Sequence, residues 1–403
     1  MTGNSTLLPR ILVLTSTFPR WVGDREPPFV FELSKRLARN CDVYVMAPHA
    51  PDAKQEEEIG KIKVIRFKYC FTNWQTLAYR GGILANLKRN RLNYLLVPCF
   101  VLFEFICLWR LLRTTRIDTI HAHWLIPQGL VAIAARACSR QSPKIICTSH
   151  GGDLFGLSGK LLTAVKCAII NRVDRLAVVS HAMRDYAYAL TTRRDIDVIP
   201  MGVDLIDQFT PTEAPRNTHT ILFVGRLVEK KGVRYLILAM EEILKVHPQT
   251  NLLIVGDGPD KSALEELAKE TGAASHIRFL GPLENNLLQE QYRQAAIFAA
   301  PSVIAKGGDQ EGLGLVFVEA LGCECAVVAS DLPAIRDIII DGVTGVICKQ
   351  RDSADLANKV ISLLDNPNLR MMLAKAGRCH VVERFDWEIV ARRYAELILD
   401  KRN

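Results

Sequence analysis

The 403-residue chain lacks the cysteine spacing of a metal or redox site. Its 11 cysteines are scattered without any CxxC pair, and the closest two are Cys323 and Cys325. We expect reduced, packed thiols, which excludes a disulfide framework and is typical of a cytoplasmic protein. The first residues, MTGNSTLLPRILVLT, also lack the basic head and apolar core of a secretory signal. No short repeat or low-complexity tract is present.

Positive charge is concentrated in the first half of the chain. The net charge is +8, but residues 1–200 hold 28 Lys and Arg against 15 Asp and Glu, and the remainder holds 23 against 28. This asymmetry favours an anionic partner for the first half, although a solvated basic surface explains the same numbers. The interleaved aromatic residues of a nucleic-acid binder are limited to Tyr69, Phe71 and Trp74. We therefore expect no nucleic acid partner.

Length and periodicity predict two α/β domains. A chain of 403 residues is too long for one core. Short, nearly continuous apolar runs alternate with longer amphipathic ones, which indicates parallel strands buried on both faces. The pattern predicts two tandem doubly wound, Rossmann-like domains. The expected strands are 11–15, 42–47, 117–122, 144–149, 175–180, 197–200, 220–225, 251–256, 277–281, 297–302 and 325–330.

A polar segment with two prolines, residues 207–219, separates the two sets of strands. We predict an N-terminal Rossmann-like domain over 1–206 and this linker over 207–219. A C-terminal Rossmann-like domain follows over 220–385, and a terminal helix over 386–403. Because open α/β sheets bind ligands at the carboxyl ends of their strands, we expect the domains to face each other across a cleft.

The segment NYLLVPCFVLFEFICLWRLL (93–112) is nearly as apolar as a membrane span. Glu104 and Arg110 lie inside it, so we predict that it does not cross a membrane. Basic residues such as Lys88 and Arg113 flank it, as in helices that lie on an anionic membrane surface. A buried crossover helix would be equally apolar, so contact with the inner face of the cell membrane stays open.

Two cations follow the first strand of the second half, in FVGRLVEKKG (223–232). Arg226 and Lys231 lie between the strand end and the next helix, where they can neutralise a diphosphate. Solvated loop charges would look the same. This stretch alone therefore does not distinguish a diphosphate-binding loop from a solvated loop.

Two glutamates bracket the glycine-rich turn in KGGDQEGLGLVFVEALG (306–322). A helix is expected to begin near Gly314, and its first amides can bind phosphate oxygens, with Gly312 and Gly314 allowing close approach. Glu319 can accept from two ribose hydroxyls, and Glu311 can reach hydroxyls beyond the phosphates. An acid among the apolar neighbours of Glu319 needs a dedicated partner. Together with the cations, this pattern predicts a nucleoside-diphosphate sugar as ligand.

The motifs GRLVEKKG, GDGP, APS…EGLGLVFVEALG, TGVI and FDWEIVARRYAEL occur in this order. With them the chain resembles retaining family-4 glycosyltransferases of GT-B fold over almost its whole length. The resemblance implies transfer of a hexosyl group from a UDP- or GDP-sugar to a hydroxyl with retained anomeric configuration. It also implies that neither a metal nor a cofactor is needed. The N-terminal domain would be the acceptor side, the C-terminal domain the nucleotide-sugar donor side, and the terminal helix would cross back to the N-terminal domain.

The resemblance also suggests residue roles. His150 is expected near the donor sugar and the reacting centre, and the catalytic set is His150, Glu311, Arg226 and Lys231. The donor-binding set is Gly23, Gly225, Arg226, Lys231, Gly281, Leu283, Glu311, Gly312, Leu313, Gly314, Leu315 and Glu319. The acceptor-side candidates are His123, Trp124 and Asp153. His121 and His123 form an HxH pattern, but no third ligand at suitable spacing accompanies them, so we predict no metal site.

The acceptor is expected to be a glycan or a lipid-linked acceptor in cell-surface polysaccharide or glycolipid biosynthesis. Two alternatives remain at this point. One is a nucleotide-sugar epimerase of similar fold, which would change its donor without any acceptor. The other is a non-catalytic protein that binds through its basic surface.

Overall fold

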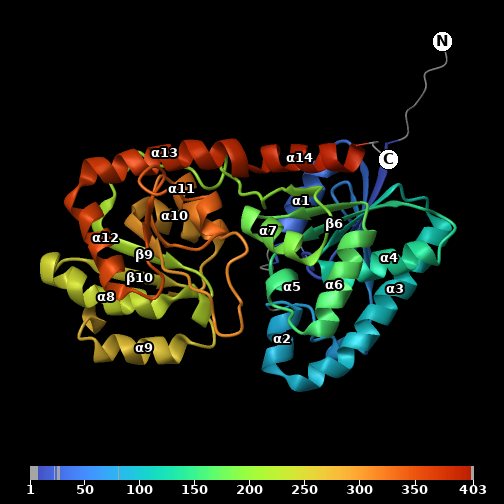
Figure 1. Cartoon of the computed structure of the whole chain (residues 1–403), viewed down its shortest axis with the longest axis horizontal. Helices are drawn as coiled ribbons and strands as arrows, with labels where there is room; N and C mark the ends of the chain where they lie inside the picture. Colours follow the sequence, from blue (N-terminus) through green and yellow to red (C-terminus); the bar gives the residue numbers. More distant parts are fainter. Residues whose placement is uncertain (1–7, 22, 25–27, 80, 401–403) are drawn as a thin grey trace, which may run out of the picture. The chain divides into compact units, whose positions relative to one another are not determined.

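The computed structural model describes residues 8–21, 23–24, 28–79 and 81–400 (Figure 1). The chain divides into two compact units. The first contains Met1–Val179, Met183–Ile199 and Ala391–Asn403, and the second contains Ser180–Ala182 and Pro200–Val390. Each unit is built on one largely parallel sheet, which confirms the predicted class of two doubly wound α/β domains.

The sheet of the first unit has the strand order β3-β4-β2-β1-β5-β6-β7-β8. Its strands are β1 (Arg10–Leu14), β2 (Asp42–Pro48), β3 (Glu56–Ile59), β4 (Ile62–Phe67), β5 (Thr119–His123), β6 (Lys144–Ser149), β7 (Arg175–Val178) and β8 (Ile196–Val198). The helices are α1 (Phe29–Leu37), α2 (Ile83–Arg89), α3 (Leu96–Thr114), α4 (Leu130–Ala137), α5 (Gly152–Phe155), α6 (Lys160–Arg172) and α7 (His181–Leu190). Strands β1, β5 and β6 are almost fully buried, which explains why their sequences are continuously apolar.

The antiparallel edge hairpin β3–β4 was not among the predicted strands. Strand β3 has the sequence EEEI, which carries no apolar run. In β4, the buried Arg66 forms an ion pair of 2.6 Å with Glu57 and donates to the Lys54 carbonyl. A paired charge occupies a core position here, so the hydrophobic pattern does not mark the strand.

The sheet of the second unit is fully parallel, with the order β11-β10-β9-β12-β13-β14. Its strands are β9 (Asn217–Val224), β10 (Asn251–Val255), β11 (Ile277–Gly281), β12 (Ala295–Ala300), β13 (Ala326–Ser330) and β14 (Val346–Cys348). The helices are α8 (Val233–Val246), α9 (Lys261–Glu270), α10 (Asn285–Gln294), α11 (Leu315–Gly322), α12 (Ser353–Asp365) and α13 (Pro367–Phe385). Helix α11 is the next helix or strand after β12, and the loop 301–314 connects the two at the carboxyl edge of the sheet.

The segment predicted as a linker is grouped with the second unit. Phe209 is 4% exposed, and Arg293 of α10 donates to the Thr210 carbonyl at 2.7 Å. The last residues of the segment already belong to β9. Both ends of the segment are thus held by the second unit, whereas residues 212–215 between them are exposed.

Helix α14 (Trp387–Leu399) ends the described chain, and its residues from Ala391 onward belong to the first unit. There Lys144 Nζ donates to the carbonyls of Leu397 and Asp400 at 3.0 and 2.7 Å. Residues 401–403 of the predicted terminal helix lie outside the described residues.

Helix α3 packs only one face against the first unit. Phe100, Glu104, Leu108 and Leu112 recur every four residues and are buried. Glu104 accepts a hydrogen bond of 3.1 Å from Gln128 Nε2, and burial raises its pKa to about 8. In the described part of the chain, one helix, spanning 91–114, is long and apolar enough to cross a membrane, with a mean hydropathy of 2.1 and 22% of the apolar window buried.

Candidate functional site

An ion pair joins the loops that follow β9 and β12, which are neighbouring strands. Lys231 Nζ lies 3.0 Å from Glu311 Oε2, with both side chains largely buried. Lys230 forms a second pair of 3.0 Å with Asp309, and its carbonyl accepts from Val303 N at 2.8 Å. Residues 80 positions apart are thus brought together at the carboxyl edge of the second sheet.

Glu311 is held as a carboxylate. Burial alone would raise its pKa, but the charge of Lys231, the charge of Lys230 and the Lys231 hydrogen bond together hold the pKa below its usual value. The site therefore contains a buried anion next to a cation. A ligand that brings negative charge to this place has to share Lys231 with Glu311.

Gly314 shapes the amino end of α11. Its φ of +90° is in the left-handed region, where L side chains are strained. A Cβ atom added there would lie 2.8 Å from Phe317 Cδ2, closer than side chains tolerate. Phe317 N donates to the Gly314 carbonyl at 3.0 Å. The amides of Leu315 and Val316 before it have no acceptor within the helix, as is usual at a helix start, and can therefore bind a ligand.

Glu319 lies on α11, and its partner is a tyrosine. Tyr292 of α10 donates its hydroxyl to Glu319 Oε2 at 2.9 Å. Burial raises the pKa of Glu319 to about 7, against smaller opposing effects of this hydrogen bond and of the Lys231 charge. Sequence reasoning missed Tyr292; its only signal was that it is the single aromatic residue of α10.

The remaining donor-set residues of the second unit lie in the same loops or further along the sheet edge. Arg226 is exposed directly after Gly225 at the end of β9, and Leu313 is buried before Gly314. Gly281 ends β11 with a φ of +72°, and the half-buried Leu283 follows it. Strand β11 lies two strands from β9. The two loops after β9 and β12, together with helix α11, carry the following predicted residues: Arg226, Lys231, Glu311, Gly312, Gly314, Leu315 and Glu319.

The first unit carries a histidine cluster at the carboxyl ends of β5 and β6. His123 Nδ1 lies 2.9 Å from His150 Nε2, and His121 Nε2 lies 2.8 Å from Thr148 Oγ1. Burial lowers the pKa of His121 and of His150 to about 3, so both imidazoles are neutral. The ring centroids of Phe29 and Trp124 are 4.9 and 5.1 Å from that of His150.

Asp153 is engaged inside the protein. Its two carboxylate oxygens accept from Leu125 N at 2.6 Å and from Ser149 Oγ at 2.8 Å. These bonds hold the loop after β5 against the loop after β6, next to Trp124 with its φ of +79°. The acceptor-side role of Asp153 stays a prediction, as does that of Trp124.

Gly23 has a φ of +81° and an open space where a Cβ would be. Its neighbours 22 and 25–27 lie outside the described residues, so the structure gives it no contact with the site. It belongs to the first unit, together with His150. Within the described ranges, no group of three His, Cys, Asp or Glu side chains is placed to hold a metal ion.

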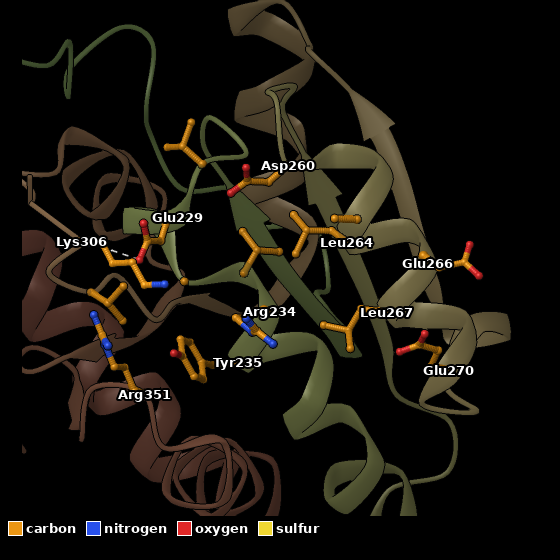
Figure 2. Close-up of a pocket in the computed structure, with 15 residues that line it drawn as sticks. Glu229, Arg234, Tyr235, Asp260, Leu264, Glu266, Leu267, Glu270, Lys306 and Arg351 are labelled. Atoms are coloured by element: carbon orange, nitrogen blue, oxygen red, sulfur yellow. Dashed lines mark hydrogen bonds between the residues drawn. The ribbon is translucent and has the colours of Figure 1, made fainter. Parts of the chain in front are cut away.

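Each unit also has a cavity that none of the predicted site residues line. In the first unit, about 520 Å³ lies between the loops after β1 and β2 and the α2 region. It is lined by polar and aromatic side chains that include Arg20, Trp21, Asn73, Tyr79, Arg89 and Asn90. In the second unit, about 740 Å³ lies between α8 and α9, where Lys306 N donates to Glu229 at 3.2 Å (Figure 2).

Comparisons with known proteins match nearly the whole chain. Residues 28–206 match the model described as Glycosyltransferase Family 4, and residues 206–380 match Glycosyl transferases group 1. Phosphatidyl-myo-inositol mannosyltransferase of Mycobacterium tuberculosis is 36% identical over 68% of this chain and 71% of its own length. Glycogen synthase of the same species is 31% identical over 71% and 70%. A GDP-mannose-dependent phosphatidylinositol monomannoside mannosyltransferase of Corynebacterium glutamicum is 31% identical over 72% and 78%.

Solved structures share the fold. Sucrose-phosphate synthase from Thermosynechococcus elongatus has a TM-score of 0.78 at 22% identity, covering 96% of this chain and 98% of that one. Anabaena HepE in complex with UDP-glucose has a TM-score of 0.70 at 19% identity, covering 96% and 99%. These likenesses confirm the predicted GT-B class. The family matches and the relatives above 30% identity show that this chain belongs to the group 1, family-4 glycosyltransferases and is a glycosyltransferase.

Proposed function

We propose that the protein transfers a hexosyl group from a UDP- or GDP-sugar to a hydroxyl of a lipid-linked glycan, with retained anomeric configuration and without a metal ion. The observation that carries the proposal is the buried Lys231–Glu311 pair beside the glycine-opened end of α11. A relative bound to UDP-glucose and relatives named as GDP-mannose-dependent support these two nucleotides.

The donor would lie along the edge formed by the ends of β9 and β12. Glu319 would accept from the ribose hydroxyls, and the first amides of α11 would bind the diphosphate. Arg226 is exposed and Lys231 lies next to the loop, so both cations can reach phosphate oxygens. Glu311 would accept from hydroxyls of the transferred sugar. Preorganised donors aimed at the leaving phosphate are usually the largest catalytic term.

Transfer would proceed on one face of the sugar. The bond between the anomeric carbon and the phosphate oxygen breaks while the bond to the acceptor oxygen forms. The proton of the acceptor hydroxyl passes to the leaving phosphate oxygen, so no enzyme nucleophile is required. This route accounts for retention with Glu311 serving as a hydrogen-bond acceptor that stays ionised.

Helix α3 supports a membrane-bound acceptor. The exposed fractions of Leu102 and Phe103 on α3 are 54% and 43%, and those of Leu92 and Leu95 in the turn before it are 71% and 74%. We propose that this face lies on the anionic inner surface of the cell membrane, because the basic residues at both ends of the helix complement lipid headgroups. The helix does not cross the membrane in this proposal, since Glu104 on its other face is packed against the protein.

A thermal-shift screen of UDP-, GDP- and ADP-sugars tests the donor class. A ligand that binds only the folded state stabilises it by about 2.7 kcal/mol at a hundredfold excess over Kd. We expect a shift with UDP- or GDP-sugars and none with ADP-sugars, and NMR of the product should show the anomeric configuration of the donor. Full activity in EDTA would support metal independence.

Incubation with the donor alone separates the proposal from the epimerase alternative. A transferase leaves the stereochemistry of the sugar unchanged and releases it only slowly to water, whereas an epimerase converts the donor without any acceptor. The appearance of an epimeric nucleotide sugar would overturn the proposal. A failure of both UDP- and GDP-sugars to bind would overturn the proposed donor class.

A further inference from the structure

The loop between β12 and α11, residues 301–314, carries Glu311 at the proposed donor site. One side of this loop is bonded to the loop after β9, where Val303 N donates to the Lys230 carbonyl at 2.8 Å. The tip of the loop, residues 306–308, is exposed, so apolar burial contributes little to its position. Hydrogen bonds and ion pairs therefore determine where the tip lies.

The other side of the loop is held at Ile304 by two side chains that follow β14. Gln350 Oε1 accepts from Ile304 N at 3.3 Å, and Arg351 Nη2 donates to the Ile304 carbonyl at 2.6 Å. Both backbone polar groups of one residue are thus bound by side chains 46 and 47 positions further along the chain. Strand β13 lies between β12 and β14, so these bonds join loops that are not adjacent at the sheet edge.

The backbone that carries the two side chains is itself held in place. Gln350 Nε2 donates to the Asp331 carbonyl at 2.6 Å, which attaches it to the end of β13. Lys349 N donates to Asp355 in the first turn of α12 at 2.7 Å, and Asp352 caps that helix by accepting from Asp355 N at 2.9 Å. The residues on both sides of the pair are therefore fixed to α12, so the two side chains reach Ile304 from a defined position.

Arg351 has a backbone conformation that favours glycine. Its φ is +60°, in the left-handed region, where a residue with a Cβ atom is strained. The residue is exposed, so burial of its side chain does not account for an arginine here. Such strain persists where the surrounding structure requires the residue. The bond from its guanidinium to Ile304 is a requirement that glycine could not meet.

We infer that Gln350 and Arg351 are positioning residues for binding of the donor. They hold Ile304, and with it the loop that brings Glu311 to Lys231. This inference rests on the proposed function, which places the donor along this loop. If the loop is released, only the fraction of molecules with the loop in place binds the donor, so the apparent affinity falls by that fraction. The bound donor and the transition state need the same loop, so the donor KM rises while kcat is kept.

Arg351→Gly removes the guanidinium and the strained Cβ atom together. Arg351 lines the cavity between α8 and α9 (Figure 2), and Ile304 is 39% exposed, so water can replace the lost bond. The midpoint of urea denaturation should therefore not fall. Hydrogen exchange of the backbone amides of residues 303–308, measured without substrate, should become about tenfold faster, the effect of one charge-assisted hydrogen bond. The donor KM should rise about fivefold, with kcat within about twofold of wild type.

Four further variants separate the bond from other effects. Arg351→Asn also tolerates the left-handed region without the flexibility of glycine, and it should behave like R351G. Arg351→Lys keeps a cationic donor on a stem of similar length, so its exchange and donor KM should stay within about threefold of wild type. Gln350→Met loses the bonds to Ile304 and Asp331 and should repeat the effect of R351G. Lys349→Met is the control, because Lys349 is exposed and bonds Asp355 through its backbone, so nothing should change.

The exchange measurement and the kinetics fail separately. Wild-type exchange of the loop in R351G and Q350M would overturn the inference whatever the activity. A loosened loop with an unchanged donor KM would instead overturn the proposed position of the donor along this loop. A loss of kcat at unchanged KM would contradict a positioning role. A loosened loop with a raised donor KM, both restored in R351K, supports the inference and the position of the donor.

Discussion

Replacing Lys231 with methionine tests the buried ion pair and the diphosphate site together. Glu311 is 8% exposed, and its Oε2 lies 3.0 Å from Lys231 Nζ. Removing one partner of a buried pair costs about 3–5 kcal/mol, because the other charge stays uncompensated. Lys230 also acts on Glu311, so we expect the lower end of that range. Urea denaturation measures the loss in free energy of unfolding.

The same variant should lower kcat about 10²–10³-fold, the usual effect of removing one donor to the developing charge. Nucleotide release from the donor that the thermal-shift screen selects measures kcat. In the double variant K231M/E311Q no charge is left uncompensated, so stability should return to within about 1 kcal/mol of wild type. Activity should stay low, because the cation is still missing.

Lys230→Met is the matched control. Its ion pair with Asp309 is more exposed, with 26% and 36% of the side chains accessible, so its loss should cost at most about 1 kcal/mol and leave kcat near wild type. Wild-type kcat in K231M, or recovered kcat in the double variant, would refute the assignment of Lys231 to the diphosphate.

Three further predictions concern α11 and the exposed apolar face formed by α3 and the turn before it. The pKa of Glu319 is raised to about 7, so the folded state holds a proton that the unfolded chain releases. Urea titrations should therefore show that the stability of the wild-type protein falls relative to that of E319Q as the pH rises through about 7. Gly314→Ala places a Cβ 2.8 Å from Phe317 at a φ of +90°, so unfolding measurements should show a loss of about 1–3 kcal/mol and calorimetry weaker donor binding. Leu95→Glu should reduce sedimentation with phosphatidylcholine–phosphatidylglycerol vesicles about tenfold, since burying a leucine is worth roughly 1.5–3 kcal/mol. Leu287→Glu, at a 53% exposed position of the second unit, should not change it.

The strands of both sheets could largely be predicted from the sequence, because parallel strands buried on two faces carry continuous apolar runs. The loops with Lys231 and Glu311 could be predicted as neighbours for the same reason, since the carboxyl ends of parallel strands share one edge. The hairpin β3–β4 could not, because EEEI is an exposed edge and Arg66 is a paired charge in the core.

Hydrogen-bond partners that depend on tertiary packing could not be predicted from the sequence either. Tyr292 reaches Glu319 from another helix, 27 residues away. The bond between His123 and His150 depends on the register of β5 against β6, which sets Thr148 beside His123. An alternating or apolar pattern specifies a face of a strand or helix, but it does not specify which polar atoms meet across two elements.

A crystal structure with an unhydrolysed nucleoside-diphosphate sugar tests the central claim most directly. We predict the diphosphate against the first amides of α11 and Lys231, with the ribose hydroxyls bonded to Glu319 and the sugar next to Glu311. Density for the diphosphate in the cavity between α8 and α9, or anywhere remote from Lys231 and Glu319, would contradict the account.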